Sequence, residues 1–143
     1  RTYENLARHG EGVFHITDDV LLLAQAVLGI ANPPLQPARQ VEGKRLSDCC
    51  RYLEFRVREF TQQGPRARIT CDVLEEGNIR EFFGLNRAKH AVVEAAIIVS
   101  RIGILPLADI SQQMHSLQSL VDKTGAPSER EAFDLLRREV SRH

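Results

Sequence analysis

The chain has 143 residues, and its 19 lysines and arginines balance 19 aspartates and glutamates, so the formal net charge is zero. A neutral chain lacks the basic field that general binding to nucleic acid or to an anionic membrane needs. With 43% hydrophobic and 27% charged residues, it has the composition of a globular domain, which excludes a mainly disordered protein. No apolar run approaches the ~20 residues that cross a bilayer. Three cysteines without a C-x-x-C spacing favour a reduced, cytoplasmic location.

The first part of the chain mixes short helices with a strand. Residues 1–10 predict a short helix, with Thr2 as its cap and Gly10 as its stop. A short strand is predicted over residues 12–17. The acidic pair that follows predicts the start of a helix over residues 20–28.

A β-hairpin is predicted near the middle of the chain. A polar loop over residues 32–47 precedes it, because prolines and a glycine break any regular pattern there. Residues 51–60 and 66–74 both alternate apolar and polar side chains, and the Gly-Pro turn between them makes the two strands antiparallel. Leu53 and Phe55 lie on the apolar face of the first strand. We therefore expect that face to be buried and the charged outer faces to carry cross-strand ion pairs.

The second half of the chain is predicted to be helical. Asn86 is the expected cap of a helix over residues 87–104. A second helix is expected over residues 109–123, and a Ser-x-x-Glu capping box at Ser128 opens a third. A β-rich half followed by three helices indicates the α+β class.

One candidate site lies at the start of the first helix, and its residues are Arg1, Thr2, Tyr3 and Asn5. A cation, a hydroxyl and an amide at a helix N-terminus can hold a phosphate, because the free backbone N–H groups and the helix dipole both favour an anion. The other interpretation is an ordinary capped helix on the surface.

A second candidate site lies at the start of the long helix, and its residues are Asn86, Arg87, Lys89 and His90. Cations in a first turn oppose the helix dipole, which points to an anionic partner. That partner is a substrate carboxylate or phosphate, or an acidic side chain of the β-rich half. Arg87 and His90 share a face with Glu94, so a solvated helix face with pairs to Glu94 is the alternative.

His15, Asp18 and Asp19 are a third cluster with chemistry-bearing side chains. A histidine beside carboxylates can form a metal or acid–base site. Only one histidine is present, and the aspartates already fit a helix start, so a structural role is favoured and no metal is expected. The chain has no sequence motif of a P-loop, a Rossmann fingerprint, a serine hydrolase or a zinc protease.

Two stretches of the chain resemble a known family. Residues 1–19 read RTYENLARHGEGVFHITDD and resemble the R/S-x-T-x-x-N segment of split β-barrel proteins, in which a short helix holds the phosphate of flavin mononucleotide (FMN). Residues 82–105 read FFGLNRAKHAVVEAAIIVSRIGIL and resemble the helical signature of the domain of unknown function family 447. Members of that family carry strands before the first segment, and we expect this chain to lack them.

The resemblance implies an α+β fold with a split-barrel-like FMN-binding domain over residues 1–78 and a helical domain over residues 79–143. It implies FMN as the cofactor, with Arg1, Thr2, Tyr3 and Asn5 at its phosphate, and a homodimer with the flavin near the interface. The implied function is that of a flavoprotein in a one-carbon, methanopterin-linked context, an oxidoreductase if it is catalytic, with no substrate assigned. The alternative is a non-catalytic partner-binding or assembly module that keeps the fold without flavin.

Overall fold

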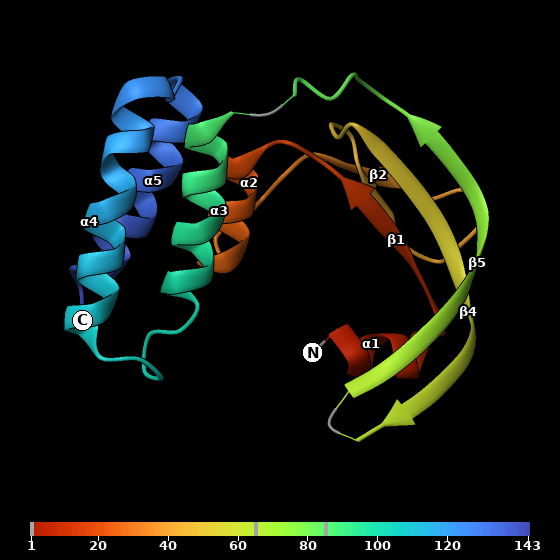
Figure 1. Cartoon of the computed structure of the whole chain (residues 1–143). Coiled ribbons are helices and arrows are strands. Elements are labelled where there is room, and N and C mark those ends of the chain that lie inside the picture. The colour runs from red at the N-terminus through yellow and green to blue at the C-terminus, as the bar shows by residue number, and fades with distance from the viewer. Residues whose placement is uncertain (1, 65, 85) are drawn as a thin grey trace. The chain divides into compact units, whose positions relative to one another are not determined.

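The computed structural model describes residues 2–64, 66–84 and 86–143 (Figure 1). The chain forms two compact units. The sheet unit comprises Arg1–Thr17 and Pro33–Phe82, and the helical unit comprises Asp18–Asn32 and Phe83–His143. An antiparallel sheet in the first half and three helices at the C-terminal end confirm the predicted α+β class.

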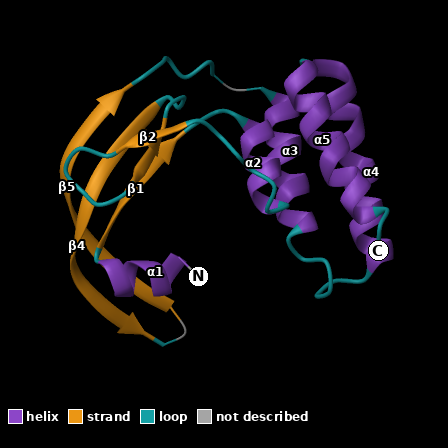
Figure 2. Ribbon diagram, turned by 180° about the vertical axis from the view of Figure 1, so that it is seen from behind, coloured by secondary structure: helices purple, strands orange, loops and turns teal. Residues whose placement is uncertain are grey.

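The sheet unit is built around a long antiparallel hairpin. Strands β4 (Arg51–Gln63) and β5 (Arg66–Asn78) form it, and both extend beyond the predicted strands. Strand β1 (Glu11–Ile16) pairs with β4, which gives the order β1-β4-β5. The short helix α1 (Thr2–His9) lies on the concave side of this curved sheet (Figure 2). Pro65 of the predicted turn lies outside the described residues.

A small second sheet lies inside the segment that we expected to be a loop. Strands β2 (Leu35–Pro37) and β3 (Lys44–Leu46) pair antiparallel, so the prediction of a loop over residues 32–47 was wrong. Proline is tolerated because it stands at the end of a strand only three residues long, where few ladder hydrogen bonds are needed. We refer to residues 35–46 as the flap.

The flap decides which face of β4 is buried. The alternation of the sequence predicts burial of Leu53 and Phe55, yet both are only partly buried. Tyr52 and Glu54 on the opposite face are 6% and 0% exposed. The prediction was wrong because the flap covers the face that carries the polar side chains, and hydrophobic patterning contains no information on such a cover.

Glu54 is the fully buried carboxylate that holds the flap on the sheet. The N–H of Arg39 donates to both of its oxygens (3.0 and 2.9 Å), and the N–H of Gln40 donates to Oε2 (2.6 Å). Arg45 of β3 places its Nη1 atom 3.9 Å from Glu54 Oε1. The Arg45 guanidinium also lies 4.4 Å from the centroid of the Tyr52 ring. A buried charge is tolerated only when it is paired and hydrogen-bonded, and both conditions are met here.

Glu75 of β5 continues this network towards the surface. It accepts a hydrogen bond from the Tyr52 hydroxyl (3.2 Å) and pairs with the Arg39 guanidinium (3.3 Å). Opposite Tyr52 on β5 stands Gly77, where an added Cβ would lie 2.7 Å from the tyrosine ring. Only glycine lets the ring approach the strand this closely.

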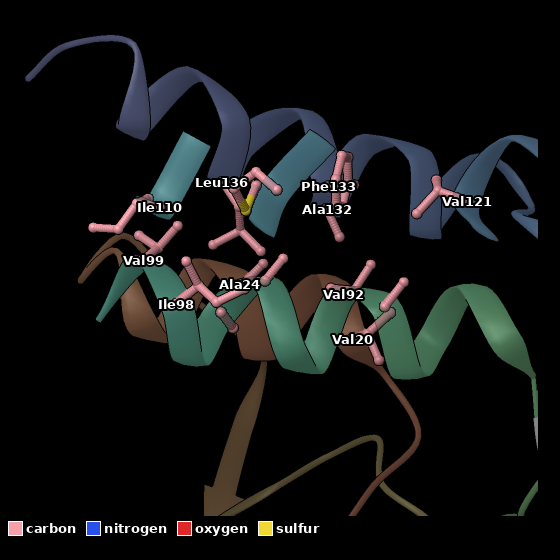
Figure 3. Packing of buried hydrophobic residues seen from close by; sticks show 14 residues of the cluster. Val20, Ala24, Val92, Ile98, Val99, Ile110, Val121, Ala132, Phe133 and Leu136 are labelled. Carbon is pink, nitrogen blue, oxygen red and sulfur yellow. The ribbon is translucent and has the colours of Figure 1, made fainter. Parts of the chain in front are cut away.

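The helical unit contains, among the described residues, helices α2 (Val20–Val27), α3 (Arg87–Val99), α4 (Leu107–Thr124) and α5 (Pro127–Val140). They share one buried apolar core (Figure 3), whose members are Val20, Ala24, Ala91, Val92, Ala95, Ala96, Ile98, Val99, Ile110, Met114, Val121, Ala132, Phe133 and Leu136. Helix α2 was expected within the sheet-containing part, yet Val20 and Ala24 are buried in this core. Burial of apolar surface therefore places segment 18–32 in the helical unit.

Two helix ends differ from the prediction. Helix α3 ends at Val99 rather than at residue 104, and Gly103 with φ +85° turns the chain before α4 begins. Helix α5 begins earlier than expected, because Glu129 rather than a Ser128 box satisfies its first turn: Glu129 Oε2 accepts the N–H of Ala126 (2.8 Å). No helix in the described ranges is long and apolar enough to cross a membrane.

Replacing Glu54 by alanine should strongly destabilise the sheet unit. The substitution leaves Arg45 as an uncompensated buried charge and leaves the flap amides without an acceptor, a loss of about 3–5 kcal/mol in the free energy of unfolding. Urea unfolding followed by circular dichroism measures the loss. The matched control is Glu76→Ala, which removes an exposed ion pair with Arg51 and should cost about 1 kcal/mol or less. Equal losses for the two variants would contradict the assigned role.

Candidate functional site

Helix α1 presents the first candidate site. Thr2 is the first residue of the helix rather than its cap, because the helix already begins at Thr2. Thr2, Tyr3 and Asn5 are all exposed, and Arg1, the fourth predicted residue, lies outside the described residues. The backbone N–H groups of a first helical turn have no partner within the helix, so this end can accept an anion.

A tight junction fixes α1 against the sheet. Gly10 has φ +68° and donates its N–H to Leu6 O (2.9 Å), and its own carbonyl accepts the N–H of Val57 in β4 (2.7 Å). Leu6 faces Gly12 of β1, where an added Cβ would lie 3.7 Å from the leucine and 3.0 Å from the Phe55 ring. The left-handed conformation at Gly10 lets the helix reverse onto the sheet within one residue.

An open hollow adjoins the first turn of α1. It has a volume of about 460 Å³ and is lined by Tyr3, Gln62, Ala67 and Ile69. The Tyr3 ring meets the Phe60 ring edge to face, with 5.7 Å between the centroids. Sequence reasoning identified Tyr3 but missed its neighbours in the hollow, because the pairing register of the hairpin brings them together and no local motif marks them.

The second predicted cluster, Asn86 to His90, begins helix α3. Asn86 is the N-cap, as predicted, and its Oδ1 atom accepts the N–H groups of Ala88 (2.8 Å) and Lys89 (3.3 Å). Arg87 and His90 are exposed. Neither forms an ion pair with Glu94 within the described part of the chain. A ligand role for Arg87 and His90 stays a prediction.

Lys89 has acidic partners within the helical unit. Its Nζ atom lies 3.4 Å from Glu129 Oε1 and 4.0 Å from Asp18 Oδ2, and it donates a hydrogen bond to the Asp18 carbonyl (2.6 Å). The two carboxylates are nearly fully buried, with side chains 4% and 3% exposed. The partners expected from the sequence were a substrate carboxylate or phosphate, or an acidic side chain of the β-rich half, and Arg87 and His90 were favoured over Lys89 as the residues that bind it. The contacts instead place Lys89 between the starts of α2 and α5.

His15, Asp18 and Asp19 have separate structural roles. His15 Nε2 accepts the N–H of Leu46 (3.0 Å), which ties the flap to β1. Asp19 caps α2 through Leu22 N–H (3.0 Å), and Asp18 Oδ2 accepts the N–H of Phe83 (3.1 Å). Among the described residues, no group of three or more His, Cys, Asp or Glu side chains is arranged to hold a metal ion.

The three cysteines, Cys49, Cys50 and Cys71, form no disulfide in the described part of the chain. Burial raises the pKa of Cys49 and of Cys71 above the ordinary thiol value. A raised pKa keeps a thiol protonated and weakly nucleophilic at neutral pH. These two cysteines therefore fit structural positions better than catalytic ones.

Comparisons with known proteins cover nearly the whole chain. A family model described as the N-terminal domain of a protein of unknown function (DUF447) matches residues 1–80, and one described as protein of unknown function (DUF447) matches residues 86–138. Among solved structures, the chain is similar to the FMN-bound protein MM1853 from Methanosarcina mazei, also assigned to DUF447. The two are 18% identical with a TM-score of 0.83, over 97% of this chain and 76% of that chain, which shows a shared fold. A search of curated proteins found no match.

The His15–Leu46 bond should make the sheet unit sensitive to mild acid. Burial lowers the pKa of His15 below its ordinary value of 6.5, and only the neutral ring can accept a hydrogen bond at Nε2. The stabilisation is present above pH 6.5, the unfolded value, and is lost as the pH falls towards and through the lower folded pKa. Thermal unfolding across this range should show a steeper loss for the wild type than for His15→Gln. The control His90→Gln, at an exposed site, should leave the wild-type slope unchanged; a slope unaffected by His15→Gln would contradict the assignment.

Proposed function

The chain belongs to the DUF447 family, and from this premise we propose that it binds FMN, with the phosphate held at the N-terminus of α1. The observation that carries the proposal is the exposed first turn of this helix beside an open hollow of about 460 Å³. A protein of the same fold, similar over 97% of this chain, is described as FMN-bound. Both observations support FMN over the unliganded alternative.

The residues of α1 fit the phosphate group of FMN. Thr2 supplies a hydroxyl donor and Asn5 supplies amide N–H donors. The backbone N–H groups of a first helical turn point along the helix axis and have no partner within the helix. The partial positive charge at this end of the helix dipole adds an attraction for the phosphate. FMN supplies the redox chemistry when bound, while the chain binds and orients it. Bound FMN that acts on a substrate would make the chain an oxidoreductase, and we propose no substrate for that reaction.

A homodimer belongs to the same proposal. Strands β1 and β5 stand at the two edges of the main sheet, so both carry ladder groups that no third strand pairs in the described residues. Phe14 and Val73 on these strands are 59% and 52% exposed. Unpaired edges beside exposed apolar side chains favour association with a second copy. Three cysteines that form no disulfide among the described residues support the proposed cytoplasmic location, where thiols stay reduced.

Replacing Asn5 by alanine should weaken FMN binding far more than it lowers the melting temperature of the ligand-free protein. A hydrogen bond to a charged group contributes ~1.5–3 kcal/mol, which corresponds to roughly a tenfold to hundredfold change in affinity. Titration with FMN, followed by quenching of flavin fluorescence, measures the change. The matched control is Asn32→Ala, an exposed asparagine outside α1, which should leave affinity unchanged. Equal affinities for Asn5→Ala and the wild type would exclude this phosphate site. A wild type that does not bind FMN would favour the alternative function, a non-catalytic partner-binding or assembly module without flavin.

Sedimentation at micromolar concentration should show a dimer. The substitution Val73→Glu places a charge in the proposed apolar contact and should shift the equilibrium towards monomer, because an unpaired charge in an interface is costly. Glu76→Gln on the same strand changes an exposed side chain and serves as the control. A wild type that sediments as a monomer would contradict the dimer and leave the FMN proposal standing.

A further inference from the structure

We propose that the hollow lined by Tyr3, Gln62, Ala67 and Ile69 receives the ring system of the flavin, so that the tip of the β4–β5 hairpin selects the ligand while α1 holds the phosphate. This inference rests on the proposed FMN function and deepens it. It assigns a binding role to three hairpin residues that carry no recognisable motif in the sequence.

The register of the hairpin builds the floor of the hollow. Phe60 is paired with Ile69, and Gln62 is paired with Ala67, across β4 and β5. Because side chains alternate along a strand, these four residues lie on one face of the hairpin. Tyr3 of α1 lies over the same face, with its ring at 83° to that of Phe60. The small side chain of Ala67 leaves the recess open between its larger neighbours.

The surface of the hollow suits a planar heteroaromatic ring. Its volume of about 460 Å³ falls in the range of small-molecule sites, roughly 300–1,000 Å³. Tyr3 and Phe60 remain 49% and 37% exposed, so aromatic surface is available for contact. A flat ligand ring in the hollow removes aromatic surface from water and gains stacked or edge contacts with Tyr3, which lines the hollow.

Gln62 supplies the polar group that such a site needs. Its Nε2 atom donates to the carbonyl of Gly64 (2.6 Å), which fixes the amide and leaves its carbonyl oxygen as an acceptor. The pyrimidine edge of a flavin carries an imide N–H, which can donate a hydrogen bond to this oxygen. One oriented amide beside the apolar side chains of Ala67 and Ile69 gives specificity for that edge.

The hollow lies directly beside the turn of α1 that is proposed to bind the phosphate. Tyr3, one of its walls, directly follows Thr2 in the first turn of α1. A ligand whose phosphate lies on that turn therefore has the hollow beside it. A phosphate at one end and a flat ring at the other are the two chemical features that FMN combines.

The test separates the two ends of the ligand with FMN and riboflavin, which lacks the phosphate. Ala67→Phe fills the hollow and should lower the affinity for FMN and for riboflavin by at least about tenfold. Thr2→Ala should weaken FMN and leave riboflavin unchanged. The matched control Thr61→Phe adds the same ring on the opposite face of β4, since Thr61 alternates with Gln62, and should leave both affinities unchanged. Circular dichroism checks that each variant is folded.

Gln62→Ala serves as a second variant that does not depend on tolerance of an added ring. It should weaken both ligands several-fold and shift the visible absorption of bound flavin, because the edge of the ring loses an acceptor. If the wild type binds FMN, and Gln62→Ala and folded Ala67→Phe bind it with the same affinity and the same absorption spectrum, the assignment of the ring to the hollow is overturned. The proposed phosphate site would not be affected by that result. A wild type that binds neither ligand would overturn the inference together with the proposed function.

Discussion

The buried carboxylate of Glu54 is the constraint on which the sheet unit depends. A charge with 0% exposure is costly unless hydrogen bonds and a counter-charge replace its hydration. The flap supplies both, through the amides of Arg39 and Gln40 and the guanidinium of Arg45. The flap must therefore cover the Glu54 face of β4, which leaves the opposite face, with Leu53 and Phe55, for helix α1. A single buried glutamate thus fixes which side of β4 the flap covers.

The local elements could be predicted because their signals are local. Asn86 caps α3 through hydrogen bonds to residues two and three positions away, and Gly10 ends α1 with a positive φ, both within reach of sequence reasoning. The hairpin followed from alternation on both sides of a turn. The burial of Glu54 could not be predicted in this way, because its partners at positions 39, 40 and 45 lie on a flap that the sequence presents as a proline-rich loop. The candidate phosphate residues came from a motif, whereas the hollow beside them came only from strand register.

The helical unit shows the same division between local and distant information. Lys89 draws together Asp18 and Glu129, two carboxylates that lie far apart in the sequence and are almost fully buried. The acidic pair Asp18-Asp19 predicted the start of helix α2 correctly but carried no information on which helices α2 packs against. Helix α2 belongs to the helical unit because its apolar side chains Val20 and Ala24 pack into the core of the C-terminal helices. Lys89, one of the first-turn cations that we assigned to a predicted anion site, instead forms a structural ion triad with Asp18 and Glu129.

Helix α1 carries the proposed phosphate site, although it contributes no side chain to a buried core. None of its residues is buried, and the contacts described for it are the Tyr3–Phe60 pair, the approach of Leu6 to Gly12 and the Gly10 junction. A ligand that binds only the folded state adds ~2.7 kcal/mol when its free concentration is a hundred times its dissociation constant. That amount is comparable to burying one large apolar side chain, about 1.5–3 kcal/mol. The proposed ligand, which spans the first turn and the hollow, would add buried contacts to α1, so its binding would stabilise the helix on the sheet.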